Sequence, residues 1–346
     1  MNAQPQRVTM DADPRLALVD RLQDAIHACI AEYMTGEPFA LVDFPDYRNV
    51  GDSAIWLGEI EYFRSNFRAR PAYVSALTDF SPEELDEAVP SGPIFIHGGG
   101  NFGDVWGGHQ DLRERILERW PDRLVVQLAQ SIHYSSMERA EQTARIIAKH
   151  KNFVLLVRDV ESKEFAERHF DCEVRLCPDM AFSIGPIEPV GQVEFSVLAM
   201  LRTDVERVGS HDFSPYPDIP VEDWITEPRT RMRAVKALAL AGAAASFQFD
   251  RFKAAKFDAA ANERLRRGVR QLSRGSAIVT DRLHVHIISL LLGRPHTTLD
   301  NSYGKVGRFM AAFSGGTDLS HRAESLDDAI AWARAQAERF ERQSAA

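Results

Sequence analysis

The segment Ala277–Gly293 (AIVTDRLHVHIISLLLG) places a cation and a titratable imidazole where a strand is expected to give way to a helix. Its β-branched start, Ala277–Thr280, is typical of a buried strand, and an apolar helical run follows. Asp281 is the expected N-cap of that helix, and Arg282 and His284 follow it closely. Open α/β sheets bind ligands beyond the carboxyl ends of their strands, so Arg282 and His284 are candidates for chemistry on an anion.

A second candidate is the glycine-rich segment Ile94–Asp104 (IFIHGGGNFGD). It begins as an apolar strand and runs into Gly98, Gly99 and Gly100, followed by Asn101. Consecutive glycines uncover backbone N–H groups and permit positive φ, so the loop can cradle an oxyanion or sugar hydroxyls. It is not a P-loop, because no Gly-Lys-Ser/Thr follows. A ligand-binding loop is therefore favoured over a simple tight turn.

The run Asn49–Ser53 (NVGDS) follows the first apolar strand and opens a helix. Gly51 permits a tight turn, and Asp52 or Ser53 can cap the helix while leaving N–H groups free to attract an anion. Such caps are common in helices that bind nothing, so an ordinary helix start is the competing interpretation. Asn49 and Asp52 are the side chains of this run placed to meet a ligand.

Cations follow two further strand-like segments. Arg158 comes after Phe153–Val157, and Lys305 and Arg308 follow a turn near the end of the chain. A planar arginine suits phosphate or carboxylate, whereas an ion pair with a neighbouring carboxylate is the competing interpretation for Arg158. Together with Arg282, these side chains supply more positive charge than a neutral substrate requires. The expected ligand is a small anion with two or three charges.

Ser131 belongs to a polar group with Gln130 and His133 at the end of a strand, and is expected to face the same cleft. His286 lies inside the helix of the first segment, among isoleucines, and is expected to be a core histidine.

Strand-like and helix-like runs alternate along the chain, which predicts an α/β protein with two Rossmann-like, doubly wound domains. The Gly- and Pro-rich stretch Ile184–Gln192 is the expected linker. It divides residues 1–185, which hold the glycine-rich loop, from residues 186–346. Helix Leu326–Arg342 is expected to pack back on the first domain, and Gly209–Pro228 to form a long surface loop. The strand-like runs are Phe39–Phe44, Ala72–Ala76, Ile94–His97, Leu124–Ala129, Phe153–Val157, Glu173–Cys177, Phe195–Leu201, Ala277–Thr280 and His296–Leu299.

Composition narrows the class of protein. The 346 residues are enough for two domains, and the net charge of −9 argues against a general nucleic-acid binder. Three cysteines without framework spacing favour a reducing compartment, and no metal-ligand spacing is present. The N-terminus has no signal-peptide pattern, and the apolar run Ala234–Phe249 is too short to span a bilayer. A cytoplasmic protein without a bound metal is expected.

Six motifs, in order over about three-quarters of the chain, resemble the polysaccharide pyruvyl transferase family. They are NVGDSAIW at Asn49–Trp56, HGGGNFGD at His97–Asp104, VRDVES at Val157–Ser162, CPDMAF at Cys177–Phe182, TDRLHVHI at Thr280–Ile287 and DNSYGKV at Asp300–Val306. Members of that family transfer the enolpyruvyl part of phosphoenolpyruvate to a sugar of an exopolysaccharide or cell-wall glycan, which gives a pyruvate ketal and phosphate. The resemblance implies a GT-B-like pair of domains around an interdomain cleft.

Carried over by motif, the resemblance assigns the donor-binding arginines to Arg158 and Arg282 and the acid to His284. An imidazolium can protonate the methylene carbon of phosphoenolpyruvate, and Asp52 or Asp104 can accept the proton of the attacking hydroxyl. The donor is a substrate, and no cofactor is implied. The remaining substrate-binding candidates are Asn49, Gly98, Gly99, Gly100, Asn101, Ser131 and Lys305.

Two other functions stay open at this point. A GT-B glycosyltransferase could use the same cations to bind the diphosphate of a nucleotide sugar, and a non-catalytic relative could bind glycans. A lipid-linked sugar acceptor would place the enzyme at the inner face of the cytoplasmic membrane. A peripheral membrane contact and a homo-oligomer are both compatible with the sequence.

Overall fold

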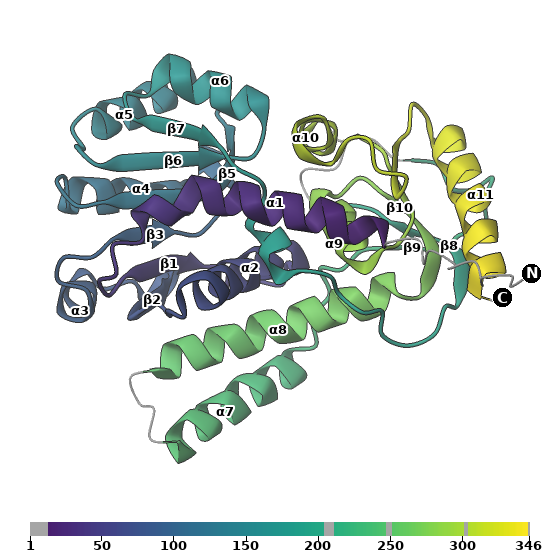
Figure 1. The fold of residues 1–346 in the computed structure, drawn as a ribbon, viewed down its shortest axis with the longest axis horizontal. Coiled ribbons are helices and arrows are strands. Elements are labelled where there is room, and N and C mark those ends of the chain that lie inside the picture. The colour runs from purple at the N-terminus through teal and green to yellow at the C-terminus, as the bar shows by residue number, and fades with distance from the viewer. Residues whose placement is uncertain (1–12, 204–210, 247–250, 301–303, 345–346) are drawn as a thin grey trace, which may run out of the picture.

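The computed structural model describes residues 13–203, 211–246, 251–300 and 304–344, and it contains two parallel β-sheets (Figure 1). The first sheet has the order β2-β1-β3-β5-β6-β7, with β4 pairing alongside part of β5. Its strands are β1 (Ala40–Phe44), β2 (Tyr73–Ala76), β3 (Ile94–Ile96), β4 (Gly99–Gly103), β5 (Val125–His133), β6 (Phe153–Val157) and β7 (Glu173–Leu176).

The second sheet has the order β12-β11-β10-β8-β9 and is also parallel. Its strands are β8 (Phe195–Met200), β9 (Val221–Glu222), β10 (Gly275–Thr280), β11 (His296–Thr298) and β12 (Ser320–Arg322). The α/β class with parallel sheets is therefore confirmed. The two sheets divide near the expected linker, and the domain boundary at residues 185–186 stays a prediction.

Helices connect the strands and cover the sheets. In the first half they are α1 (Pro14–Ile30), α2 (Val50–Phe67), α3 (Pro82–Ala88), α4 (Gly107–Arg119), α5 (Met137–Ile147) and α6 (Val160–His169), with short 3₁₀ turns η1 (Ala31–Tyr33), η2 (Leu77–Asp79) and η3 (Met180–Ile184). In the second half they are α7 (Arg229–Ala245), α8 (Phe252–Leu272), α9 (Leu283–Leu292), α10 (Lys305–Phe309) and α11 (Leu326–Ser344), with a π-helical turn, η5 (Met310–Ser314). Among the described residues, none of the helices combines the length and the apolar character needed to cross a bilayer.

The first sheet has apolar side chains on both faces, and helices cover both, as expected for a parallel sheet. Along β1, Ala40 and Val42 belong to one hydrophobic cluster, while Leu41 and Phe44 belong to another on the opposite face. That second cluster continues through Trp56 of α2 into the second half of the chain. One continuous core therefore joins the two sheets and fixes the strand ends of one relative to the other.

The structure corrects several sequence predictions. The glycine-rich loop is partly a strand, because Gly99–Gly103 pairs with β5. Helix α11 packs on β8, β10 and β11 of its own sheet, since Ala329, Ile330, Ala333 and Ala337 join the cluster under that sheet. Part of the loop Gly209–Pro228 lies outside the described residues, and the remainder contains β9 and the buried Trp224.

His286 is fully buried, as expected for a core histidine, and it belongs to a chain of polar contacts. Its Nδ1 lies 2.7 Å from Nε2 of His296, and its Nε2 lies 2.8 Å from Oγ of Ser314. Burial lowers the pKa of His286 well below its ordinary value and lowers the pKa of His296 to about 4. Both imidazoles are therefore neutral in the folded protein near pH 7.

The buried pair of His286 and His296 predicts that acid lowers the stability of the folded protein. The unfolded state takes up a proton on His296 near pH 6.5, but the folded state does so only near pH 4. The free energy of unfolding should therefore fall as the pH drops between these values, by about 2 kcal/mol at pH 5 from His296 alone. Urea unfolding at pH 7 and pH 5 measures this loss. His296→Gln should reduce the loss, whereas His169→Gln on α6 should not. An equal loss in wild type and His296→Gln would contradict the prediction.

Candidate functional site

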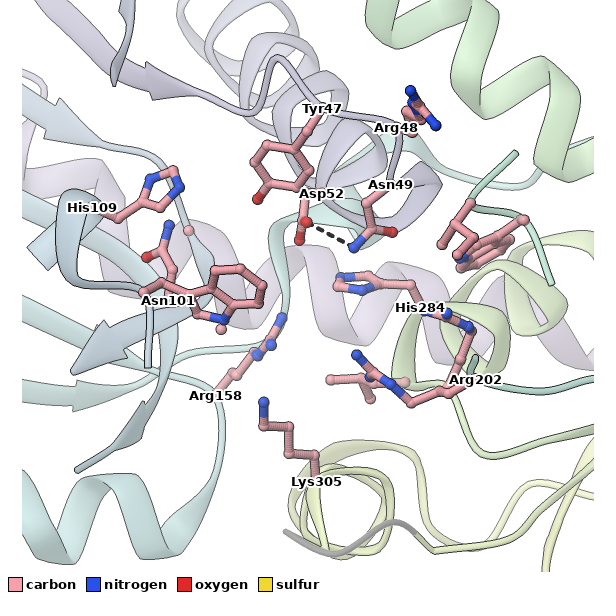
Figure 2. Close-up of a pocket in the computed structure, with 17 residues that line it drawn as sticks. Tyr47, Arg48, Asn49, Asp52, Asn101, His109, Arg158, Arg202, His284 and Lys305 are labelled. Atoms are coloured by element: carbon pink, nitrogen blue, oxygen red, sulfur yellow. Dashed lines mark hydrogen bonds between the residues drawn. The ribbon is translucent and has the colours of Figure 1, made fainter. Parts of the chain in front are cut away.

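A pocket of about 590 Å³ opens where strands of both sheets end (Figure 2). The segments that line it follow β1, β3, β4 and β6 in the first sheet and β8, β9, β10 and β11 in the second. The continuous core between the sheets therefore brings the separate motifs together. The lining residues are Tyr47, Arg48, Asn49, Asp52, Gly98, Gly100, Asn101, Trp106, His109, Arg158, Arg202, Trp224, Ile225, Arg282, Leu283, His284 and Lys305.

Asp179 links the candidate arginine to the candidate acid. Its Oδ2 accepts a hydrogen bond from Nη1 of Arg158 at 2.5 Å and lies 3.4 Å from Nε2 of His284. Burial alone would raise the pKa of Asp179, but the charges of His284 and Arg158 hold it below its ordinary value. The carboxylate therefore stays ionised and lies between the two side chains. Asp159 instead caps α6, so the local ion pair considered for Arg158 does not form.

Arg158 and Lys305 converge on the glycine-rich segment (Figure 2). A Cβ on Gly100 would lie 3.2 Å from Nη2 of Arg158 and 3.7 Å from Nζ of Lys305. Ser131 lies behind them, where its Oγ accepts a hydrogen bond from Nε of Arg158 at 3.0 Å. Two cations from opposite halves of the chain thus face one spot beside an uncovered backbone, which suits an anion.

His284 packs directly against the start of α2. A Cβ on Gly51 would lie 2.4 Å from its Nδ1, so only glycine leaves room for the imidazole there. Asn49 is the N-cap of α2: its side chain accepts from the N–H of Gly51 and donates to Oδ2 of Asp52 at 2.8 Å. The sequence prediction of Asp52 or Ser53 as the cap is wrong, because the helix begins at Val50. Asp52 is left facing the pocket.

Arg282 lies on the opposite wall. Its Nη2 donates to Oδ2 of Asp223 at 2.7 Å, and its guanidinium lies over the ring of Trp224. Asp281 accepts a hydrogen bond from the backbone N–H of Arg202, and Arg282 occupies the N-cap position of α9. The predicted Asp281 cap is therefore wrong. A guanidinium has no acceptor atom, so Arg282 cannot cap the first turn of α9, which faces the pocket.

A second histidine–carboxylate pair lies across the pocket. Nδ1 of His109 is 2.8 Å from Oδ1 of Asp43, a buried residue held at φ 73°. Non-glycine residues seldom adopt this conformation, and such strain tends to persist at functional sites. The nearby carboxylates of Asp52 and Asp43 raise the pKa of Tyr47, so its phenol stays protonated.

The glycine-rich segment is held from behind. Glu59 of α2 accepts from the N–H of Gly98 at 2.8 Å, and its other oxygen pairs with Nδ1 of His97. The Asn101 side chain accepts from Arg113 and Gln130, so most of its polar capacity is used inside the protein. This segment is therefore a rigid wall rather than a mobile loop.

Three other sequence candidates lie outside the pocket lining. Gly99 lies behind Asp52, which would be 3.7 Å from a Cβ there. Arg308 pairs with Glu161 instead of joining the cation cluster. Asp104 accepts hydrogen bonds from the N–H groups of Ser135 and Ser136. Of the two candidate bases, Asp52 and Asp104, only Asp52 lines the pocket.

Several residues in or behind the pocket wall were not predicted from the sequence. They form ion pairs between distant parts of the chain: His109 with Asp43, Arg158 with Asp179, and Arg282 with Asp223. Asp179 lies in the CPDMAF motif, which marked its segment without showing what the carboxylate does. Among the described residues, no group of three or more His, Cys, Asp or Glu side chains is arranged to hold a metal ion.

Comparisons with known proteins agree with the motifs. The family model for polysaccharide pyruvyl transferases matches residues 49–303. Pyruvyl transferase 1 of Schizosaccharomyces pombe is 30% identical over 84% of this chain and 74% of its own length. EpsO of Bacillus subtilis is 30% identical over 76% of this chain and 81% of its own. A Klebsiella pneumoniae crystal structure of unassigned function shares the fold, with a TM-score of 0.54 and 17% identity over 88% of this chain and 99% of that one. This chain therefore belongs to the polysaccharide pyruvyl transferase family and is a pyruvyl transferase enzyme.

Proposed function

We propose that the enzyme uses phosphoenolpyruvate as donor and forms a pyruvate ketal on a sugar of an exopolysaccharide or cell-wall glycan precursor. The observation that carries this proposal is the convergence of Arg158 and Lys305 on Gly100, with Asp179 joining Arg158 to His284. Phosphoenolpyruvate carries a carboxylate and a phosphate on one small carbon skeleton, so it needs cations and a proton donor close together.

In the proposed reaction, His284 donates a proton to the methylene carbon of the donor. The imidazole lines the pocket, and its Nε2 lies 3.4 Å from Oδ2 of Asp179. Asp179 would hold the imidazole in place and stabilise its protonated form. Protonation creates an oxocarbenium-like centre at the carbon that bears the phosphate.

Two sugar hydroxyls would then attack that carbon, one after the other, and phosphate would leave. Of the two hydroxyl protons, one replaces the proton that His284 gave to the methyl group, and the other leaves with hydrogen phosphate. Asp52 is the proposed base for the attacking hydroxyl, because it faces the pocket and Asn49 orients it. In a GT-B-like arrangement, the acceptor would enter between the two halves of the chain.

The donor assignment predicts binding without an acceptor. Phosphoenolpyruvate should bind the wild-type enzyme in isothermal titration calorimetry, and Lys305→Ala should weaken that binding about tenfold or more, since one charge-assisted contact is lost. Arg308→Ala is the matched control, because this cation lies outside the pocket and pairs with Glu161. Thermal stabilisation by UDP- or GDP-sugars but not by phosphoenolpyruvate would instead favour a glycosyltransferase.

A further inference from the structure

The hairpin of α7 and α8 carries a charge opposite to that of the rest of the molecule. Residues 229–272 contain eleven lysines and arginines but only three acidic residues, whereas the whole chain has a net charge of −9. Four exposed arginines of the hairpin form no ion pair within the described residues. They are Arg229, Arg233, Arg266 and Arg270.

The outer helix of this hairpin, α7, packs on α8 and presents its other face to solvent (Figure 1). Positions at four-residue spacing form one exposed ridge, in which Arg229 and Arg233 lead into Ala237, Ala241 and Ala245. Beside the ridge, Leu238 is 73% exposed, more than any other large hydrophobic side chain in the part of the chain that the structure describes. The face thus combines cations with apolar surface, as helices that lie in a membrane interface do.

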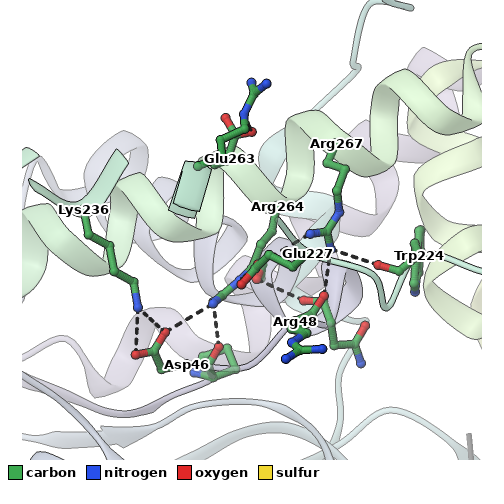
Figure 3. Close-up of polar contacts among 12 residues, drawn as sticks. Asp46, Arg48, Trp224, Glu227, Lys236, Glu263, Arg264 and Arg267 are labelled. Carbon is green, nitrogen blue, oxygen red and sulfur yellow. Dashed lines mark hydrogen bonds and ion pairs between the residues drawn. The ribbon is translucent and has the colours of Figure 1, made fainter. Parts of the chain in front are cut away.

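The inner side of the hairpin is tied to the pocket wall (Figure 3). Lys236 and Arg264 both bind Asp46, and Arg264 also donates to the carbonyl oxygen of Pro45. Arg267 donates to the carbonyl oxygens of Arg48 and Trp224, which line the pocket. If the outer face of α7 bound to another surface, the pocket would therefore lie at a fixed distance and orientation from that surface.

We propose that the α7–α8 hairpin docks the enzyme on an anionic phospholipid surface. The positive charge of the hairpin is complementary to acidic headgroups, which attract lysine and arginine side chains near the surface. The same charge disfavours a second copy of the chain, because two cationic hairpins would repel each other. A soluble polyanion would match the charge of the hairpin, but it would not bury the alanines of the ridge or Leu238.

Vesicle co-sedimentation tests this docking with the full chain. The protein should sediment with vesicles that contain phosphatidylglycerol but not with pure phosphatidylcholine. Raising the salt from 0.1 M to 1 M, which shortens the screening length from about 10 Å to about 3 Å, should release it. Arg229→Glu/Arg233→Glu should weaken binding at least about tenfold. Leu238→Asp should weaken it as well, because it removes the largest apolar group from the ridge.

The matched control is Arg145→Glu/Lys149→Glu on α5 and the turn after it, which changes the net charge equally on a different surface. It should bind vesicles like the wild type, and circular dichroism should show all variants folded. The proposal is overturned if anionic vesicles are not bound or if the control loses binding as much as the hairpin variant. It is equally overturned if Leu238→Asp binds normally while dextran sulfate competes away all vesicle binding. None of these results depends on pyruvyl transfer.

Discussion

Replacing His284 with alanine is expected to slow phosphate release from phosphoenolpyruvate in the presence of a glycan acceptor by about 10²–10⁴-fold, the usual contribution of a positioned general acid. Binding of phosphoenolpyruvate should persist, because Arg158 and Lys305 remain in place. Release of phosphate under single-turnover conditions measures the chemical step, and calorimetry measures donor affinity. Turnover like that of the wild type would remove His284 from the mechanism.

A double-mutant cycle with Asp179 separates the acid role from a structural one. Asp179→Asn keeps the shape but removes the charge that orients His284 and Arg158. If the two residues act as one unit, the double variant should be little slower than His284→Ala alone. Fully additive losses would show that Asp179 acts through Arg158 only. Because the Asp179 carboxylate is stabilised in the folded state, Asp179→Asn should also flatten the loss of stability at acidic pH.

Substituting Gly51 with alanine is expected to reduce turnover about 10²-fold or more, because the new Cβ would overlap the imidazole of His284. The Cβ would lie 2.4 Å from Nδ1 and 2.5 Å from Cγ, so the ring must swing away from the start of α2. Cβ of His284 would also lie only 2.7 Å away, and rotation of the ring cannot relieve that contact, so the starts of α2 and α9 must separate and some stability is lost as well. Steady-state kinetics and thermal unfolding of the same preparation would show a large loss of activity in a protein that still unfolds cooperatively, with a smaller fall in Tm than a clash with backbone atoms would cause.

Two other helical glycines provide the controls for this prediction. A Cβ on Gly58 would lie 1.9 Å from the carbonyl oxygen of Met180, so Gly58→Ala must push backbone apart and should lower Tm strongly. A Cβ on Gly242 of α7 would meet nothing within 4 Å, and Gly242→Ala should keep full activity and gain about 1 kcal/mol of stability. Normal turnover in Gly51→Ala would mean that the His284 ring needs no support from α2.

The strands were the most predictable part of the fold. β1 and β6 are short apolar runs buried on both faces, and burial of that kind leaves a continuous pattern in the sequence. The strand β4 was missed because its glycines carry no side-chain pattern, and it forms only where β5 offers a free edge. Helix α11 was assigned to the wrong surface, since its amphipathic pattern shows that one face is buried but not what covers it.

The same contrast holds for the site. The sequence by itself determined which residue types follow the strands: Arg158, Arg282, His284 and the glycines, each with chemistry that suits a small anion. Only the tertiary structure decided their partners, because ion pairs such as Arg158–Asp179 and Arg282–Asp223 join segments 21 and 59 residues apart. A local pattern reports how a segment is buried. It carries no information on which distant side chain meets it across the pocket, since the packing of both sheets on one core sets that geometry.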